Sequence, residues 1–501
     1  RFTFSCYDEN GDFHASNLPI YVIDDTIYKV SPDLLIGTID KFASLPWREE
    51  AIASFQSLEN KLAPELIVQD ELHLISGPLG SVSGMYEILI DSLFENKINN
   101  KIVKAKLVGS TATISKAEEQ IKSLYARKSC LFPPQTNQIE NNFFSIEDEE
   151  SDGRKYVGLF CSSSTSPQIT LSKIISSILV SGKYLELNSE NSDIIDPYWT
   201  QLIYFNSIRE LMAGASLIND DVRDYKNAIY SKKGYSLFNK EYYRNVKWQE
   251  LTSRKQSSEI PEILSQLFVE KKFDEKYKAL DICLATNMIQ VGIDIPRLSL
   301  MIINGQPKTT SEYIQASSRV GRKGGSPGII FTILSPFKAR DRSHYEHFKS
   351  YHQSIYNYVE PTSVTSHSDP VRKRCLHAVI IGLCRLWDLN LRKSPRPTPS
   401  EELKKRVKDC ILNYVKKADE GHPDEVEKTE KEISKIFNKW ENISPNHYGS
   451  MSLSQKNRDI LMYPAGGEKL PDAEPFETLT SMRNVDKECN AKLLSDFKGE
   501  R

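Results

Sequence analysis

Two adjacent carboxylates, Asp70 and Glu71, follow a short apolar run, and His73 comes two residues later. A buried parallel strand over residues 66–68 would present these side chains at its C-terminal end, where ligands of α/β proteins gather. One carboxylate of such a pair can hold Mg²⁺ on nucleotide phosphates, and the other can polarise the attacking water. On its own this tetrapeptide is more often a solvated acidic turn, so a hydrolytic site depends on what the rest of the chain supplies.

Hydroxyl side chains follow another apolar run. A strand is predicted over residues 107–110, and Thr111 and Thr113 come after it. Small hydroxyl groups at a strand end can hydrogen-bond neighbouring carboxylates and relay a change at the phosphate. A helix N-cap at Thr113 or Ser115 is an alternative, and it is compatible with that role.

Two arginines form the strongest candidate site. Gln315 begins a segment that contains Arg319 and Arg322, which are three residues apart. If the segment is helical, both guanidinium groups point the same way and can neutralise charge that develops during phosphoryl transfer. A basic surface patch is the alternative, but a predicted strand over residues 301–303 and Gly321 between the arginines favour a positioned site.

A polar segment upstream of the arginines supplies further candidates. Thr286 follows a predicted strand over residues 282–285, and Asp294 lies in a Gly-Ile-Asp turn. Thr286 could donate a hydrogen bond to a nucleic-acid phosphate, and Asp294 could hold a ribose hydroxyl or an arginine. Taken alone, the segment is better explained as an ordinary connection between a strand and a helix.

Composition sets broad limits. The chain has 501 residues, of which 39% are hydrophobic and 26% are charged, with a formal net charge of −2. This fits a soluble globular protein of about two to four domains, and the longest apolar stretch is too short to span a bilayer. The net charge indicates no nucleic-acid partner, although a motor can carry its basic residues locally. The eight cysteines form no C-x-x-C pair, so we expect a cytoplasmic protein without a zinc site or disulfide framework.

Strand-like and helical runs alternate along most of the chain, which predicts an α/β fold with parallel sheets and flanking helices. A further helix is predicted from Thr398 as N-cap with Pro399 at its first position. Strands are expected over residues 34–38, 66–68, 107–110, 282–285, 298–304 and 328–334, and helices over 83–94 and 169–179. Residues 202–205 fit both a strand and a helix over 199–211, and the polar residues 206–207 that follow favour the strand. The expected domains are a first lobe over residues 1–140, a linker over 141–155, a second lobe over 156–340 and a helical accessory region over 341–501.

Together these segments resemble the motifs of superfamily 2 helicases, over about residues 20 to 340. Residues 70–73 resemble motif II, 111–113 motif III, 285–294 motif V and 315–322 motif VI, while 37–41 and 203–207 resemble motifs Ib and IV. The resemblance implies two RecA-like lobes that use ATP and Mg²⁺ on nucleic acid. It further implies a role for each matching residue: Asp70 as Mg²⁺ ligand, Glu71 as general base, His73 in coupling the lobes, Arg319 and Arg322 as arginine fingers, Gln315, Gly292 and Asp294 in binding nucleotide, and Thr38, Thr111, Thr113 and Thr286 in coupling or nucleic-acid contact.

Two further segments, residues 335–346 and 481–486, resemble the large helicase subunit of DISARM-type phage defence and similar bacterial proteins. This resemblance implies DNA as the partner, with RNA as an open alternative, and other subunits of a defence complex. DNA repair is a second setting that suits such a motor. No membrane partner is expected.

Two departures from the helicase pattern weigh against a complete motor. Ala316 and Ser318 stand where motif VI usually has arginine and glycine, and the sequence contains no G-x-x-x-x-G-K-[ST] phosphate loop. Because the chain opens with Arg1, we interpret it as the C-terminal portion of a longer motor that by itself hydrolyses ATP poorly. A catalytically degenerate module that binds nucleic acid or protein is the alternative.

Overall fold

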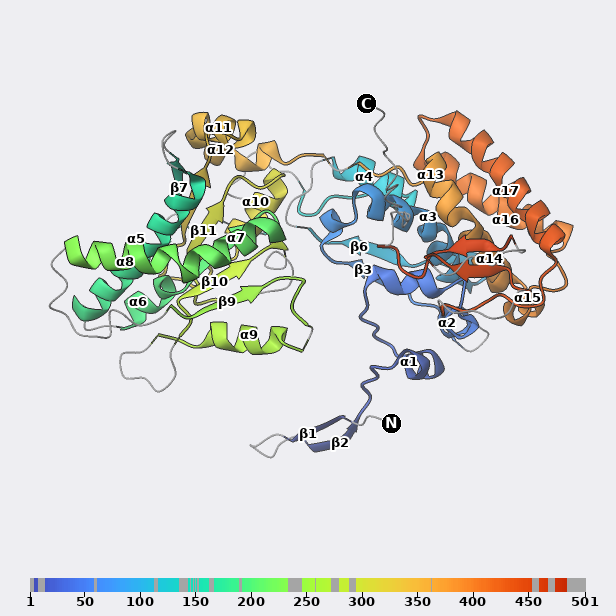
Figure 1. Ribbon diagram of the computed structural model, residues 1–501. Helices are drawn as coiled ribbons and strands as arrows, with labels where there is room; N and C mark the ends of the chain where they lie inside the picture. The colour runs from blue at the N-terminus through green and yellow to red at the C-terminus, as the bar shows by residue number, and fades with distance from the viewer. Residues whose placement is uncertain are drawn as a thin grey trace, which may run out of the picture. The chain divides into compact units, whose positions relative to one another are not determined.

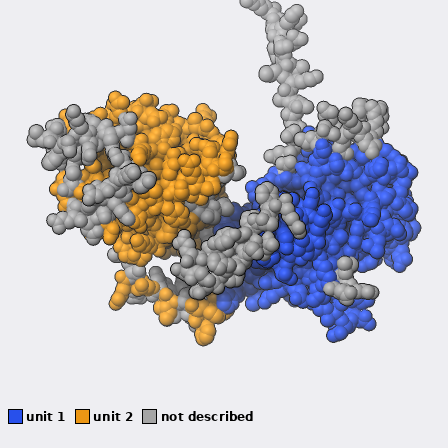
Figure 2. Space-filling model, turned by 90° about the horizontal axis from the view of Figure 1, so that it is seen from below, with its two compact units in different colours: residues 1–132, 361–501 blue, residues 133–360 orange. Residues whose placement is uncertain are grey.

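The structure, a computed structural model, divides into two compact units (Figure 2), residues 1–132 with 361–501 and residues 133–360. The chain thus leaves the first unit at residue 132 and returns to it at residue 361. The structure describes residues 4–7, 14–57, 61–111, 116–134, 143–144, 146, 148, 150, 153–161, 166–188, 192–232, 246–256, 258–271, 279–287, 294–361, 363–452, 459–466 and 474–483.

The first unit combines short strands with long helices (Figure 1). Its strands β3 and β6 pair in parallel, β4 and β5 pair in antiparallel, and β13 and β14 pair in parallel. Its elements are β1 Phe4–Tyr7, β2 His14–Leu18, α1 Asp24–Val30, η1 Ile39–Ser44, α2 Glu49–Phe55, β3 Leu66–Gln69, η2 Leu72–Leu74, α3 Gly77–Leu93, β4 Glu95–Ile98, β5 Lys101–Lys104, β6 Lys106–Gly109, α4 Ala117–Tyr125, α13 Asp369–Val371, η7 Arg372–Leu376, α14 His377–Trp387, α15 Leu389–Lys393, α16 Glu401–Ala418, α17 Pro423–Ile443, β13 Met462–Pro464 and β14 Phe476–Thr478.

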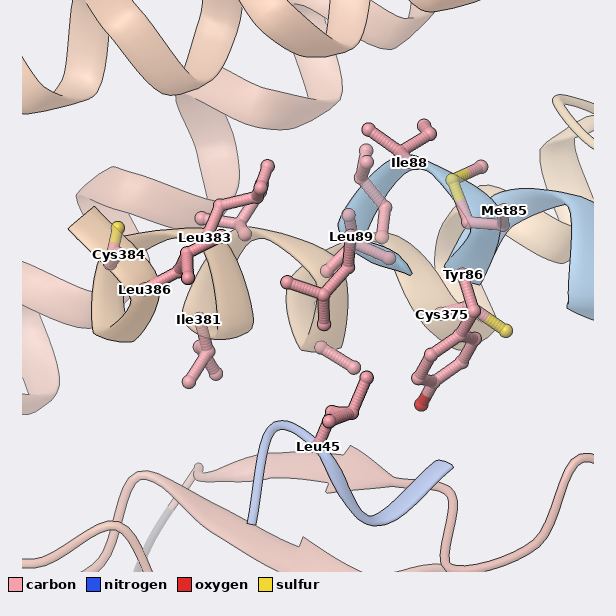
Figure 3. Packing of buried hydrophobic residues seen from close by; sticks show 14 of the residues in the cluster. Leu45, Met85, Tyr86, Ile88, Leu89, Cys375, Ile381, Leu383, Cys384 and Leu386 are labelled. Carbon is pink, nitrogen blue, oxygen red and sulfur yellow. The ribbon is translucent and has the colours of Figure 1, made fainter. Parts of the chain in front are cut away.

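Helices α3 and α14 form the centre of this unit. Apolar side chains of both helices belong to one buried cluster, and Figure 3 shows Leu89 of α3 gathered with Leu383 of α14 and with Leu45. A Cβ at Gly382 would lie 2.4 Å from Leu89 Cδ2, so the glycine lets the two helices approach closely. Residues about 300 positions apart in sequence therefore share one core, and this burial joins the C-terminal helices to the N-terminal part of the unit.

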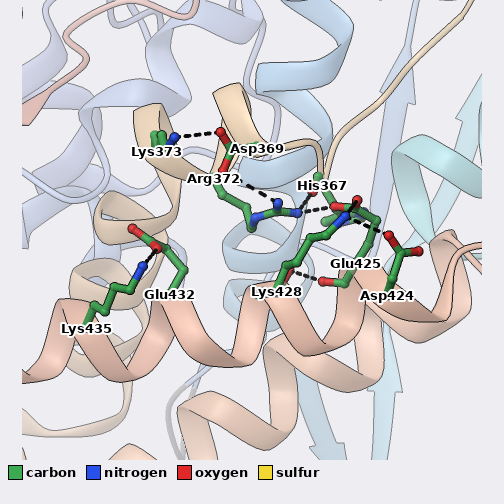
Figure 4. A network of polar contacts seen from close by, with 10 residues as sticks. His367, Asp369, Arg372, Lys373, Asp424, Glu425, Lys428, Glu432 and Lys435 are labelled. Carbon is green, nitrogen blue, oxygen red and sulfur yellow. Dashed lines mark hydrogen bonds and ion pairs between the residues drawn. The ribbon is translucent and has the colours of Figure 1, made fainter.

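Polar contacts fix the returning chain to α16 and α17 (Figure 4). The His367 side chain is fully buried, and its Nδ1 lies 2.9 Å from Asp419 Oδ2. Arg372, also buried, forms an ion pair with Glu425 at the start of α17 and donates to the backbone oxygen of His367. Since a buried charge is costly unless it is paired, this network specifies where the chain re-enters the unit.

One carboxyl group of α3 predicts a pH-dependent stability. Glu87 is 7% exposed, and burial, reinforced by the Asp91 carboxylate and opposed by Arg127, raises its pKa from 4.5 to about 8. As pH rises, the unfolded chain loses this proton before the folded protein does. The contribution of Glu87 to the free energy of unfolding is therefore complete below pH 4.5 and is lost as the pH rises to about 8. Glu87→Gln removes this titration and should raise the stability at pH 8 by at least about 1.4 kcal/mol, the worth of one pKa unit.

Thermal melting of the variant and the wild type at pH 4.5 and pH 8 tests this expectation. Glu402→Gln, which changes an exposed glutamate of α16, is the matched control and should melt like the wild type at both pH values. A stabilisation by Glu87→Gln that is equal at both pH values would show that the Glu87 carboxyl does not titrate in this window.

The second unit is a six-stranded sheet in the order β7-β12-β11-β8-β10-β9, with every pair parallel. Along β8, Leu202 and Tyr204 belong to one buried cluster and Ile203 and Phe205 to another, so both faces of the sheet are covered. Its elements are β7 Lys155–Phe160, α5 Pro167–Asn188, α6 Ser192–Trp199, β8 Gln201–Phe205, α7 Ile208–Asn219, α8 Asp221–Lys232, β9 Trp248–Leu251, α9 Ile260–Phe268, β10 Ile282–Ala285, β11 Leu300–Asn304, α10 Thr310–Ser317, β12 Ile329–Leu334, α11 Ala339–Glu346, α12 Phe348–Gln353 and η6 Ile355–Tyr358.

The predicted α/β class, with parallel sheets and a helical C-terminal region, is confirmed. The grouping of segments differs from the expected domains, which set residues 341–501 apart as an accessory region. Residues 341–360 remain with the second unit, because Tyr351 packs in its core and the Glu360 carboxylate accepts a hydrogen bond of 2.9 Å from the Thr310 amide. Residues 361–501 join the first unit through the core of α3 and α14.

Three local expectations are wrong. Residues 34–38 form no strand, and Ile36 is 88% exposed, because no described strand lies beside them to pair with. The strand β3 exists, but it is not buried as expected: Val68 is 61% exposed, and β6 is its one neighbour among the described strands. Helix α16 begins after Ser400, whose hydroxyl accepts from the Leu403 amide, rather than after Thr398.

Candidate functional site

The candidate residues of the first unit lie where β3 and β6 end side by side. The two strands pair in register, with Gln69 opposite Gly109. The pairing continues beyond them, because the Ser110 amide donates to the Gln69 oxygen and the Leu72 amide donates to the Ser110 oxygen, both at 2.9 Å. Residues 70–73 and 110–111, which were predicted from separate motifs, are thereby joined through the backbone.

Asp70 is held in its ionised form. Its Oδ1 accepts hydrogen bonds from the Ser110 hydroxyl and, at 2.9 Å, from the Glu71 amide. These two bonds, with a smaller effect of His73, hold the pKa of Asp70 below its usual range. Both bonds use Oδ1, so Oδ2 is the oxygen that remains for a further ligand.

A Mg²⁺ ion fits this carboxylate if other oxygens complete its shell. In the part of the chain that the structure describes, no group of three or more His, Cys, Asp or Glu side chains could hold a metal ion. Magnesium commonly binds one or two carboxylates together with substrate phosphates and water, so a single aspartate is a sufficient protein ligand. Asp70 therefore fits the role of a metal ligand that acts with a bound nucleotide.

Glu71 and His73 follow in a tight turn. Glu71 has φ 50° and ψ 48°, a left-handed conformation that costs a non-glycine residue energy and persists when surrounding bonds impose it. Its Oε2 lies 3.4 Å from His73 Nδ1, and that nitrogen is also 3.0 Å from Thr111 Oγ1. His73 is 8% exposed, so this buried imidazole connects the acidic turn with the hydroxyl segment after β6.

The remaining candidates of the first unit are less well placed. Thr38 is the residue before η1, and its side chain makes no capping hydrogen bond to that helix. Thr113 lies outside the described residues, so the structure does not place it. Of the two candidate threonines that the structure describes in this unit, Thr111 is the one with a hydrogen-bond contact to another predicted site residue, His73.

The candidate residues of the second unit lie at the carboxyl edge of its sheet. Asn206, after β8, donates from Nδ2 to the Gly305 oxygen at 3.1 Å, and Ser207 caps α7 by accepting from the Glu210 amide at 3.2 Å. Thr286, after β10, is 7% exposed. Since parallel strands end at one edge, this edge holds Asn206, Ser207 and Thr286 from the segments that resemble motifs IV and V. Gly292 lies outside the described residues.

The expectation that Arg319 and Arg322 share a helix is wrong. Helix α10 contains Gln315, whose Nε2 donates to Ser311 Oγ at 3.2 Å, but the helix ends at Ser317. The chain then turns, because Gly321 has φ +65° and its amide donates to the Leu298 oxygen at 2.8 Å. The two arginines therefore lie in a turn that follows the helix.

Arg322 has two anchors in this turn. Its Nη1 lies 3.0 Å from Asp294 Oδ1, and its Nε donates to the Ser318 oxygen at 2.9 Å. Of the two roles that the sequence leaves open for Asp294, the structure contains the contact with an arginine. The motifs V and VI are thus connected through an ion pair.

Sequence reasoning missed two residues that hold these loops. Arg154, placed in the predicted linker, donates from Nε to the Val320 oxygen at 2.8 Å and from Nη2 to the Ser318 oxygen at 3.2 Å. Asp341, which is 1% exposed, accepts from the amides of Gln306 and Ser335, both at 3.1 Å. Arg154 had no local signal, whereas a lone aspartate within a basic helix could have drawn attention to Asp341.

The turn at Gly321 carries a testable prediction. A Cβ at this position would lie 2.4 Å from the backbone nitrogen of Gly328, and φ is positive. Gly321→Ala should therefore lower the stability of the second unit by about 1–3 kcal/mol and displace the arginines. Thermal melting measures the loss, and Gly324→Ala is the control because open space surrounds that position. Equal melting temperatures of the two variants would contradict the tight turn.

Comparison with known proteins gives a consistent assignment. Residues 223–324 match the family described as helicase conserved C-terminal domain. Over 444 residues the chain is 40% identical to the DISARM protein DrmA of Bacillus paralicheniformis, an alignment that covers 82% of this chain and 38% of that protein. The chain therefore spans well under half the length of this curated relative.

Solved structures of helicases are similar at a lower level. The DUF1998 helicase MrfA bound to DNA and AMPPNP is 14% identical with a TM-score of 0.47, covering 72% of this chain and 42% of that one. The Mycobacterium smegmatis helicase Lhr bound to ssDNA and AMP-PNP is 14% identical with a TM-score of 0.46, covering 79% and 40%. In the described residues, no helix is long and apolar enough to cross a membrane. By these comparisons, residues 223–324 match a helicase conserved C-terminal domain, and most of the chain is similar in sequence to part of the DISARM protein DrmA.

Proposed function

We propose that this protein is an ATP-dependent helicase or translocase that moves on nucleic acid, with DNA as the first candidate substrate, in phage defence or DNA repair. The observation that carries the proposal is the joining of Asp70, Glu71 and His73 to Ser110 and Thr111 at the ends of two parallel strands. In that arrangement, a change in the contacts of the carboxylates with a bound phosphate would also change the hydrogen bonds of the segment after β6. The resemblance to the large helicase subunit of DISARM-type phage defence implies DNA as the substrate and other defence subunits as partners, and the sequence identity with the DISARM protein DrmA supports that resemblance.

Each side chain has a distinct task in the proposed reaction. Mg²⁺, when bound, would neutralise phosphate charge during transfer. Asp70, ionised and with Oδ2 available, would hold that ion, and Glu71 would accept a proton from the attacking water. Arg319 and Arg322 would stabilise the charge that develops on the transferred group. His73, which contacts both Glu71 and Thr111, would couple a movement of the Glu71 carboxylate to the segment after β6.

The structural change that follows release of the phosphate would then have to be transmitted to the residues that contact nucleic acid. Thr38, Thr111, Thr113 and Thr286 are the proposed coupling or nucleic-acid residues of this chain. Gln315, Gly292 and Asp294 are the proposed nucleotide contacts, although Asp294 would act through Arg322 rather than on the ribose. Backbone amides and a lysine for the phosphates themselves are not supplied by a G-x-x-x-x-G-K-[ST] loop in this sequence.

The experiment that tests this function is a measurement of ATP hydrolysis by the protein expressed from its complete gene. The rate should rise when single-stranded DNA is added. No stimulation by single-stranded DNA, duplex DNA or RNA would contradict the motor. The 501-residue chain by itself should hydrolyse ATP poorly for want of the phosphate loop.

A second candidate function is a nucleic-acid or protein clamp without catalysis, which the absence of a phosphate loop from this sequence favours. A clamp would bind DNA or a partner with an affinity that does not change when ATP is added. Titration of labelled DNA with and without ATP separates the two functions, because a motor changes its affinity between nucleotide states.

A further inference from the structure

The C-terminal segment, residues 474–483, is fixed within the core of the first unit. Its strand β14 pairs with β13, and the Phe476 ring stacks on His377 of α14 at 5.1 Å between centroids. His377 Nε2 and Thr478 Oγ1 are 3.0 Å apart, and burial lowers the pKa of His377 to about 3. The imidazole is therefore neutral at physiological pH, and the start of the segment has one defined position.

The same segment then reaches the residues after η1. The Trp47 indole Nε1 donates to the Leu479 oxygen at 2.9 Å, across 432 positions of sequence. Leu479 is 1% exposed, and Met482 is completely buried. These contacts deliver Ser481 and Arg483, on either side of Met482, to one side chain near the beginning of η1.

That side chain is Asp40. Its Oδ1 accepts from the Ser481 hydroxyl at 2.8 Å and from the Arg483 amide at 3.2 Å, and its Oδ2 lies 2.7 Å from Arg483 Nε. Both carboxylate oxygens are thus engaged by two residues of the C-terminal segment. Asp40 is 20% exposed while Arg483 is 69% exposed, so the aspartate is the enclosed partner.

Asp40 lies in residues 37–41, called the 37–41 loop below, which lead into η1 and pack Ile39 against the apolar core of the unit. Thr38 makes no side-chain capping bond, and a Cβ at Gly37 would meet nothing within 4 Å. Lys41 pairs with Asp24 at 2.8 Å, but the lysine side chain is 59% exposed. The contact with the C-terminal segment is therefore an enclosed polar attachment of this loop, beside the apolar packing of Ile39.

We propose that the C-terminal segment positions the 37–41 loop for nucleic acid, with Arg483 as a positioning residue that acts through Asp40. The inference rests on the proposed function, in which this loop, through Thr38, contacts nucleic acid. It assigns a role to residues 481–483, whose resemblance to defence helicases has no explanation in the ATP site. A segment some 440 residues away in sequence would thus change the affinity for nucleic acid without contacting the nucleotide.

The test uses Arg483→Ala, Asp40→Asn and the double variant in the protein expressed from its complete gene. Arg483→Ala should raise the single-stranded DNA concentration that gives half-maximal ATPase stimulation by roughly two- to five-fold, the range that an exposed ion pair supports. The saturated rate should stay near that of the wild type. Arg483→Lys should restore part of the affinity, and the double variant should be no weaker than the weaker single variant.

Lys122→Ala, which breaks an exposed ion pair with Glu420 elsewhere in the unit, is the matched control. It should leave unchanged the DNA concentration that gives half-maximal ATPase stimulation. Hydrogen exchange of the amides of residues 37–41 is the second measurement, and Arg483→Ala should accelerate it. Unchanged exchange would overturn the inference whatever the ATPase shows. Faster exchange without a change in the half-maximal DNA concentration would also overturn it. So would a double variant in which the losses of DNA affinity from the two single variants add.

A wild-type protein without any stimulation by nucleic acid would refute the proposed function, and with it the role of the loop in nucleic-acid contact. The exchange experiment would still decide whether Arg483 orders the loop. The two failures are therefore distinguishable.

Discussion

Glu71→Gln is expected to lower nucleic-acid-stimulated ATP hydrolysis by at least about 100-fold, the lower range of what a general base contributes. Glutamine keeps the size of the side chain but cannot accept a proton from water. The backbone of the turn should survive, because it is held by the Leu72 amide on Ser110 and by the Glu71 amide on Asp70. DNA binding in the presence of ATP should remain within a few-fold of the wild type.

Glu65→Gln is the matched control for this experiment. Glu65 is an exposed glutamate directly before β3, whereas Glu71 is the second residue after its end, so the two changes are chemically the same at opposite ends of one strand. The control should hydrolyse ATP at the wild-type rate. A Glu71→Gln protein that keeps most of its activity would remove Glu71 from the role of general base.

The sequence predicted those parts of the structure that depend on local pattern. The all-apolar run of residues 282–285 becomes β10 with the same bounds, since a central parallel strand is buried on both faces. The meeting of Asp70 with Ser110 follows from the same logic, because each side chain comes directly after a strand and parallel strands end at one edge. Separate motifs could therefore be placed together before any contact was known.

Other parts could not be predicted, because their cause lies far away in sequence. The apolar residues 34–36 look like a buried strand, but a strand needs a neighbour, and pairing is not encoded in the run itself. The contact of Asp40 with Arg483 and the packing of α3 on α14 involve residues hundreds of positions apart. The turn at Gly321 is intermediate, since the glycine is visible but its close approach to Gly328 is not.

That turn decides how the arginines should respond to mutation. Helical spacing would make Arg319 and Arg322 equivalent, whereas the structure gives Arg322 a specific anchor in Asp294. An arginine held at two points loses less freedom when it meets a phosphate, which is the benefit of preorganisation. Asp294 therefore orients the arginine. Removing its carboxylate should lower the ATPase rate less than removing the guanidinium group does.

Arg322→Ala is accordingly expected to lower the saturated ATPase rate by about 10³-fold, as the loss of an arginine finger does. Asp294→Asn should lower it by no more than about five-fold, because an exposed ion pair contributes at most about 1 kcal/mol. Lys323→Ala, the neighbouring exposed cation, is the control and should keep the wild-type rate. Steady-state ATPase assays at saturating DNA measure all three. Equal losses for Arg322→Ala and Lys323→Ala would mean that this turn acts only through its positive charge, and the positioned arginine would have to be abandoned.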